Sequence, residues 1–127
     1  MPLVRIDVPQ GLSSEQLRAI SDGVHRALVE AAGVPALDRF HVVSEHAPGR
    51  LIVDPEYLGI HRSAGAVVVQ ITLNMGRTLD QKRALYAAIA RNLVANPGVR
   101  TEDILVSLVE VVKENWSFGN GVAQYAS

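Results

Sequence analysis

The chain has 127 residues, of which 48% are hydrophobic, 12 are basic and 13 are acidic, a composition that suits one domain with a substantial core. The balanced charge gives no electrostatic footprint for nucleic acid or an anionic membrane. Because cysteine is absent, disulfides and thiolate chemistry are excluded. No apolar stretch is long enough to span a bilayer, and the N-terminus shows no secretory leader pattern. We therefore expect a cytoplasmic protein with no membrane partner.

The first elements read as a strand, a helix and a second strand. Apolar residues occupy every second position of residues 3–8, which predicts a strand. A helix should follow, because Ser13 and Gln16 have the spacing of a capping box and apolar residues then recur on one helical face. Gly33 is typical of a helix end. A returning strand is expected at residues 39–45.

This pattern recurs 65 positions later, where Gly33 falls on Gly98, without any gap between the copies. The second copy has its own capping pattern at Thr78 and Gln81, followed by a returning strand near residues 104–112. Further identical pairs under this shift are Val4 and Val69, Ile6 and Ile71, Gly11 and Gly76, Arg26 and Arg91, and Asp38 and Asp103. The chain is thus predicted to contain two copies of one supersecondary unit.

We expect a single domain, residues 1–127, with its units at about 2–45 and 67–112. A strand–helix–strand unit implies parallel strands joined by a right-handed crossover. Two units predict an α/β (α+β) fold, with a four-stranded sheet and two helices on one face. The other face lacks cover within the chain, so we expect a homo-oligomer.

Two segments lie outside the repeat. The connecting loop, residues 46–66, is rich in proline and glycine and is expected to carry a short strand at residues 51–53. The tail, residues 113–127, holds three of the six aromatic residues and reads as a C-terminal hairpin turned by glycines.

Pro2 follows the initiator methionine and directly precedes the first strand. Removal of Met1 would leave a secondary amine at the N-terminus. An α-amino group titrates at about 7.7–8.0, so this amine could act as a base, an acid or an iminium-forming nucleophile near neutral pH. The alternative is that Pro2 simply begins an edge strand, where its missing N–H costs nothing.

The Pro2–Leu3 strand and the doubled unit resemble the tautomerase superfamily. Three segments are similar to its malonate semialdehyde decarboxylase-like group, namely Gly-Val-Pro-Ala-Leu-Asp-Arg-Phe at 33–40, Leu-Gly at 58–59 and Trp-Ser-Phe-Gly at 116–119. The resemblance covers nearly the whole chain. It implies a tautomerase-like fold, a homotrimer with three active sites, a catalytic terminal proline, no metal and no organic cofactor.

The same resemblance implies roles for individual residues. Pro2 matches the catalytic proline, and Asp38 matches an acidic partner that holds a proton on the amine or activates water. Arg77 matches one of the arginines that bind the substrate carboxylate. The best-known members carry two arginines one residue apart, and Met75 stands where the first would be. Half of the expected carboxylate clamp is therefore missing.

Trp116 and Phe118 match the apolar wall of the family's site, and Tyr125 would extend that wall. Arg39 and Arg62 are reserve candidates for the missing arginine.

The repeat bears on these roles. Asp38 has a counterpart, Asp103, so a structural role in capping a shared turn competes with the catalytic one. Arg77 falls on Leu12, so the fold does not require an arginine at that position. The four histidines show no metal-ligand spacing, and His25 is expected on the solvated side of its helix.

The function favoured by these observations is decarboxylation of a small 3-oxo acid such as malonate semialdehyde, with an oxo-acid carboxylate as the partner bound. One alternative is a keto–enol tautomerase of 2-oxo acids, in which neutral proline moves a proton between carbon and oxygen. The other is a non-enzymatic trimeric interaction module. Retention of Met1 would block the amine and leave only that last reading.

Overall fold

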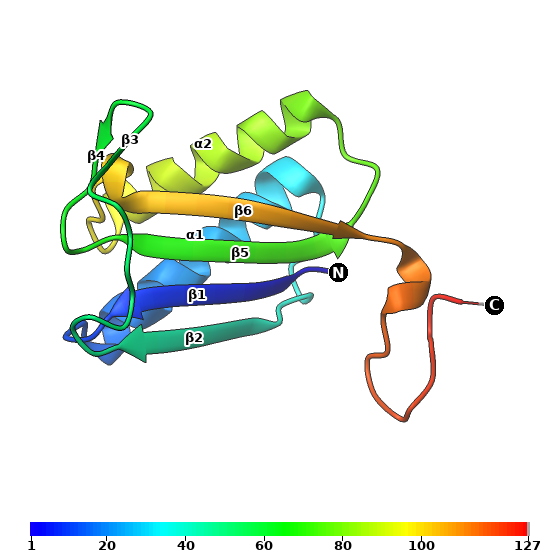
Figure 1. Ribbon diagram of the computed structural model, residues 1–127. Helices are drawn as coiled ribbons and strands as arrows, with labels where there is room; N and C mark the ends of the chain where they lie inside the picture. The colour runs from blue at the N-terminus through cyan, green and yellow to red at the C-terminus, as the bar shows by residue number, and fades with distance from the viewer. Residues whose placement is uncertain (127) are drawn as a thin grey trace.

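The computed structural model describes residues 1–126 and contains one four-stranded sheet covered on one face by two helices (Figure 1). The sheet order is β2-β1-β5-β6, in which β1 pairs in parallel with β2, β5 in parallel with β6, and β1 antiparallel with β5. The predicted fold class is confirmed. The elements are β1 Leu3–Pro9, α1 Ser14–Ala32, β2 His41–His46, β3 Glu56–Tyr57, β4 Ile60–His61, β5 Val67–Asn74, α2 Leu79–Ala95, η1 Thr101–Asp103, β6 Ile104–Val111 and η2 Lys113–Asn115.

Both helices begin at the predicted capping boxes. Ser13 caps α1 and Thr78 caps α2, each in a reciprocal pair with the glutamine three residues later. α1 ends directly before Gly33, whereas α2 ends at Ala95, three residues before Gly98, but equivalent hydrogen bonds follow both helices. The N–H groups of Gly33 and Val34 both donate to Leu28 O, and those of Gly98 and Val99 both donate to Leu93 O. The same hydrogen bonds therefore close the helix in each unit.

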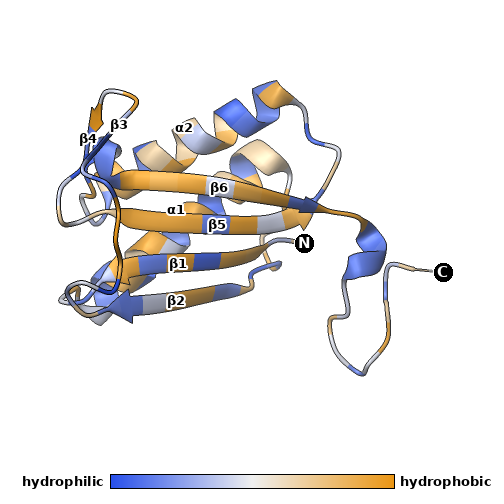
Figure 2. Cartoon of the chain, viewed as in Figure 1, coloured by the Kyte–Doolittle hydropathy of each residue, from blue (hydrophilic) through white to orange (hydrophobic). Residues whose placement is uncertain are grey.

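The core lies between the sheet and the two helices. Alternate residues of β1 and β5 face the helices and are buried, whereas Arg5 and Gln70 on the opposite face are exposed. Figure 2 shows apolar residues along most of β5 and β6, with polar residues interrupting β1. The residues of this core include Val4, Ile6, Val8, Ile20, Val24, Leu28, Val69, Ile71, Leu85, Ile89 and Leu93. Neither helix is long and apolar enough to cross a membrane, among the residues described.

The strand predicted at residues 51–53 is wrong. Instead, a small hairpin pairs β3 with β4, and its turn is formed by Leu58 and Gly59. Both turn residues have positive φ, 54° and 74°, the backbone shape that lets a two-residue loop join twisted strands. Residues 51–53 are apolar, but they belong to neither of the two sheets formed within residues 1–126.

The tail reverses direction, but within residues 116–126 it forms no strand, so the predicted C-terminal hairpin is wrong in its backbone pairing. The side chain of Gln124 makes the hydrogen bonds that hold the tail together, in place of backbone pairing between two strands. Phe118 N–H donates to Gln124 Oε1 at 2.9 Å, and Gln124 Nε2 donates to Gly119 O at 2.8 Å. Positive φ at Gly119, Asn120 and Gly121 interrupts the extended conformation that a ladder needs.

Candidate active site

The amino terminus meets a buried carboxylate. Pro2 is buried at the start of β1, and the Met1 ammonium lies 3.2 Å from Asp38 Oδ2. Asp38 is buried, and neither of its carboxylate oxygens accepts a hydrogen bond from residues 1–126. A buried carboxylate without donors is costly unless a positive charge compensates it. The amino terminus supplies that charge.

The second unit shows what a structural aspartate looks like at the same place. Asp103 is also buried, but its two oxygens accept from Ser63, one from the backbone N–H at 2.7 Å and one from the hydroxyl at 2.5 Å. In both units the turn itself is closed by the backbone, through Asp38 N–H to Pro35 O and Asp103 N–H to Arg100 O. The Asp38 side chain is thus not needed to cap its turn, which favours the functional reading over the structural one.

Arg77 is fixed at the C-terminal end of α1. Its Nε and Nη2 donate to Ala32 O at 3.0 and 2.8 Å, and its Nη1 donates to Asn74 O at 3.1 Å. A positive charge is favourable there, because the last carbonyls of a helix carry partial negative charge. A guanidinium has five N–H groups, so two remain for another acceptor. Arg77 is therefore both a structural residue and a preorganised donor.

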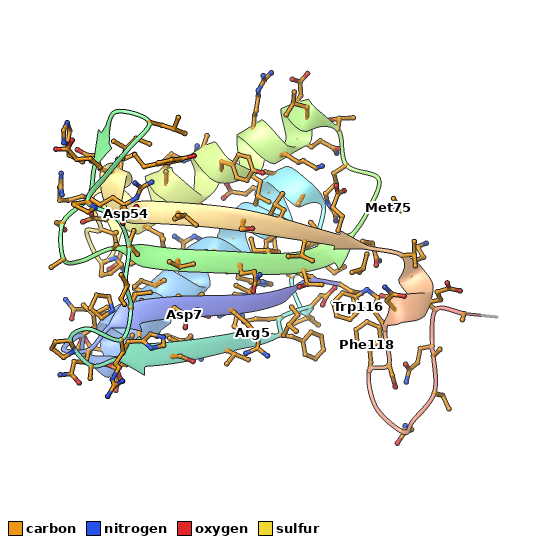
Figure 3. The ribbon with its side chains drawn as sticks, in the orientation of Figure 1. Arg5, Asp7, Asp54, Met75, Trp116 and Phe118 are labelled. Carbon is orange, nitrogen blue, oxygen red and sulfur yellow. The ribbon has the colours of Figure 1, made fainter. Side chains whose placement is uncertain are left out.

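The tail places an aromatic cluster at the same end of the sheet, where Trp116 and Phe118 lie side by side (Figure 3). Their rings stack at 5.5 Å with an interplanar angle of 10°. Phe118 also meets Tyr125 edge-on at 5.2 Å and Phe40 at 6.1 Å. The indole N–H of Trp116 donates to Asn74 Oδ1 at 2.7 Å. The cluster therefore includes Phe40 and is hydrogen-bonded to Asn74, two residues for which the sequence predicted no role.

The strand register explains why these groups converge. In the antiparallel pair β1–β5, Leu3 lies opposite Thr72, so continuing this register sets Pro2 opposite Leu73, beside Asn74. Arg77 lies three residues after Asn74 and reaches back to the end of α1, which leads into the turn that carries Asp38. One end of the sheet thus joins an amine, a carboxylate, a guanidinium and an apolar wall.

Met75 lies at this end of the sheet but offers no side-chain donor, and the two reserve arginines, Arg39 and Arg62, have other surroundings (Figure 3). Met75 is 61% exposed on the loop after β5. Arg39 is bound to Asp22 at 2.5 Å, and this hydrogen bond lowers the pKa of the Asp22 carboxyl. Arg62 follows β4, which packs against η1 near Asp103.

His25 is 5% exposed, so the expectation that it is solvated was wrong. The face of α1 that was predicted to be polar packs against the turn that follows the helix. There, His25 Nε2 lies 2.8 Å from Ala36 O. His41 packs edge-on against His25, and its Nδ1 lies 2.7 Å from Ser21 Oγ. Burial, aided by the nearby Arg39 charge, lowers the pKa of His41 to about 4, so this histidine is neutral at pH 7. No group of three or more metal-binding side chains gathers anywhere in residues 1–126.

A cavity of about 450 Å³ opens at the opposite end of the sheet. Its lining includes Leu12, Gly98 and Asp103, which the repeat relates to Arg77, Gly33 and Asp38. Leucine replaces the arginine, and Ser63 already satisfies the aspartate. Arg100 also lines this cavity, but its lining holds no amine, so we place the candidate site at the end of the sheet where Pro2 lies.

Comparisons with known proteins identify the family of the chain. Two family models, both described as tautomerase enzymes, match residues 38–119 and residues 2–60. The chain is 37% identical over 124 residues to "Probable tautomerase YusQ" of Bacillus subtilis (strain 168), with 98% of each chain covered.

Two solved structures of malonate semialdehyde decarboxylases superpose closely. The FG41 enzyme, inhibited by 3-bromopropiolate, has a TM-score of 0.90 and 41% identity, covering 97% of this chain and 93% of that one. A second such decarboxylase, to which decarboxylase and hydratase activities are ascribed, has a TM-score of 0.90 and 34% identity, covering 97% and 95%. A fused 4-OT protein described as a symmetric trimer has a TM-score of 0.78 and 26% identity, with 94% of both chains covered.

Proposed function

The chain belongs to the tautomerase family, and on that premise we propose that it is an enzyme that uses the Pro2 amine on small oxo acids. Its main reaction would be cofactor-free decarboxylation of a 3-oxo acid such as malonate semialdehyde. The observation that carries this proposal is Asp38, a buried carboxylate whose only charged neighbour among residues 1–126 is the amino terminus at 3.2 Å. Removal of Met1 would transfer the terminal positive charge to the secondary amine of Pro2, one residue along the chain from the ammonium that lies beside this carboxylate.

The Asp38 carboxylate would pair with a protonated Pro2 amine, as it pairs with the Met1 ammonium in the structure. The protonated Pro2 would donate a hydrogen bond to the β-carbonyl oxygen of the substrate, and the two N–H groups left on Arg77 would hold the carboxylate. The bond from the carboxylate carbon to its neighbour then breaks, its electron pair forms the enolate, and carbon dioxide leaves. A proton returns to carbon to give the aldehyde. Trp116 and Phe118 would exclude water, which strengthens the charge stabilisation.

A keto–enol tautomerase of 2-oxo acids is the second candidate. Met75 leaves this chain without the paired arginines of the best-known decarboxylase-like members, which weakens the match to their substrate. The name of the YusQ relative points the same way. The pKa of Pro2 separates the two functions, since a value below about 7 suits the neutral base and one above about 8 suits the protonated acid.

We also propose a homotrimer as the active form. The sheet face opposite the helices exposes Val42 and Val109 beside Arg5, and no part of residues 1–126 covers it. The fused 4-OT neighbour, described as a trimer, supports this assembly.

The test begins with the intact mass of the purified protein, which should lack Met1. Turnover is then measured with matched 3-oxo and 2-oxo acids, and Pro2 is titrated by NMR. Pro2→Ala should lower kcat/KM by about two to four orders of magnitude, because the secondary amine and its rigid ring are lost. Pro9→Ala, at the far end of β1, is the matched control and should keep near-normal turnover. Near-normal rates in correctly processed Pro2→Ala would end the proline mechanism. Retained Met1 would leave the interaction module as the remaining reading.

A further inference from the structure

Asn74 binds two parts of the candidate site at once. It is the last residue of β5, and its backbone carbonyl accepts from Arg77 Nη1 at 3.1 Å. Its side-chain oxygen accepts from the indole N–H of Trp116 at 2.7 Å. One residue thus touches both the guanidinium and the aromatic wall.

The Trp116–Asn74 hydrogen bond fastens the tail to the body. Within residues 116–126, every other side-chain hydrogen bond stays inside the tail, as between Gln124 and Phe118 or Gly119. The ring of Phe118 also contacts Phe40, and the backbone N–H of Trp116 donates to Lys113 O at 3.4 Å. An indole N–H is only a donor, and a partly buried donor without an acceptor is costly. Loss of the Asn74 acceptor would therefore release Trp116 from its orientation.

The repeated unit does not explain an asparagine here. Under the shift that superposes the two units, Asn74 falls on Pro9, which has no side-chain acceptor. Arg77 likewise falls on Leu12. Both departures from the repeat occur at the end that carries Pro2 and Asp38, and the hydrogen bonds link them to each other.

We infer that Asn74 is a positioning residue: it sets the plane of Trp116 against Phe118 and couples that wall to the arginine that binds the substrate carboxylate. This inference rests on the proposed function for the role of Arg77. The role of Asn74 toward Trp116 stands on the contacts alone. Asn74 itself need not contact the substrate.

Trp116 is the only tryptophan in the chain, so its fluorescence reports this contact without labelling. In Asn74→Leu, which has a similar branching pattern but no acceptor, the emission should shift to the red and acrylamide quenching should rise. Asn74→Asp keeps an acceptor oxygen and should restore both signals. Gln70→Leu removes another amide from the same strand and face, where it makes no side-chain hydrogen bond to residues 1–126, and should leave emission unchanged.

The kinetic readout separates positioning from folding. Asn74→Leu should raise KM about tenfold with a smaller change in kcat. This is the size of effect expected when the loss of one hydrogen bond misplaces the aromatic wall of the site. Malonate, an unreactive carboxylate, should quench Trp116 in the unaltered protein and bind about tenfold more weakly to the variant. Native emission, quenching and malonate affinity in Asn74→Leu would overturn the inference. If no oxo acid is turned over by the unaltered protein but these binding differences persist, the proposed function fails and the positioning role stands.

Discussion

At the scale of single residues, the arginine at position 77 divides its donors between the protein and a ligand. Three of its contacts go to backbone carbonyls at the end of α1 and at Asn74. This anchoring removes most of the rotamer freedom that an arginine would otherwise lose on binding. Removal of Arg77 should therefore affect both catalysis and stability, and the two effects need separate measurements.

We predict that Arg77→Ala costs roughly 2–5 kcal/mol in apparent transition-state binding, the range for losing one partner of a desolvated charge pair. Arg77→Lys should recover only part of this loss, because an ammonium cannot donate in the planar, two-point manner of a guanidinium. Steady-state kinetics give the catalytic effect, and urea titration gives the stability effect. Arg50→Ala, in the exposed connecting loop, is the control.

Met75→Arg belongs to the same prediction. It should tighten binding of small 3-oxo acids, because it would add a second donor at the position where the resembling enzymes carry one. Full activity of Arg77→Ala with every carboxylate tested would contradict this assignment of the clamp.

At the scale of elements, the two helices meet at a glycine. Gly23 of α1 is buried, and Asn92 of α2 donates to its carbonyl at 2.9 Å. A Cβ at position 23 would lie 2.9 Å from Leu93 Cδ2 and 3.3 Å from Asn92 Cβ. The absence of a side chain at Gly23 therefore sets how closely α1 and α2 approach.

We predict that Gly23→Ala destabilises the protein by about 1–3 kcal/mol, although helix propensity alone would favour alanine by about 1 kcal/mol. Leu93 is fully buried and cannot turn away from the added methyl group without disturbing its neighbours. Urea unfolding measures the change. In a Leu93→Ala background the same substitution should become neutral or stabilising, and an equal penalty in both backgrounds would refute the steric explanation.

The elements that the sequence predicted well are those fixed by nearby residues. The alternation in β1, the two capping boxes and the turn after Gly33 depend on neighbours within a few positions, so both helices and the sheet followed from the sequence. The strand expected at 51–53 and the hairpin expected in the tail failed, because strand pairing needs a partner that local pattern does not reveal.

The candidate site was predicted to a similar extent. Asp38 and Arg77 were found through resemblance, and the structure places them at the Pro2 end. Asn74 and Phe40 were missed, because their roles come from contacts across the sheet and with the tail. Asn74 had one signal available, since it falls on Pro9 in an otherwise similar repeat.

At the scale of the whole molecule, the uncovered sheet face leads to a prediction about assembly. Sedimentation at micromolar concentration should give the mass of three chains. Val109→Asp places a charge on this face and should reduce both the mass and the turnover, because an unpaired charge in an interface is costly. Val94→Asp, at a similarly exposed position on α2, should leave the mass unchanged. A single-chain mass for the unaltered protein would contradict the trimer.

Because the unit is repeated within one chain, two units share a single amino terminus. Val67 occupies the place in the second unit that Pro2 occupies in the first, but its nitrogen is committed to a peptide bond. A chain has one amino terminus, so two ends of similar architecture share one ionisable amine. The position of the chain terminus, and not the folded shape of the unit, therefore determines which end of the sheet can carry the terminal amine. At the Asp103 end no chain terminus can supply an amine, and Ser63 pairs with the carboxylate instead.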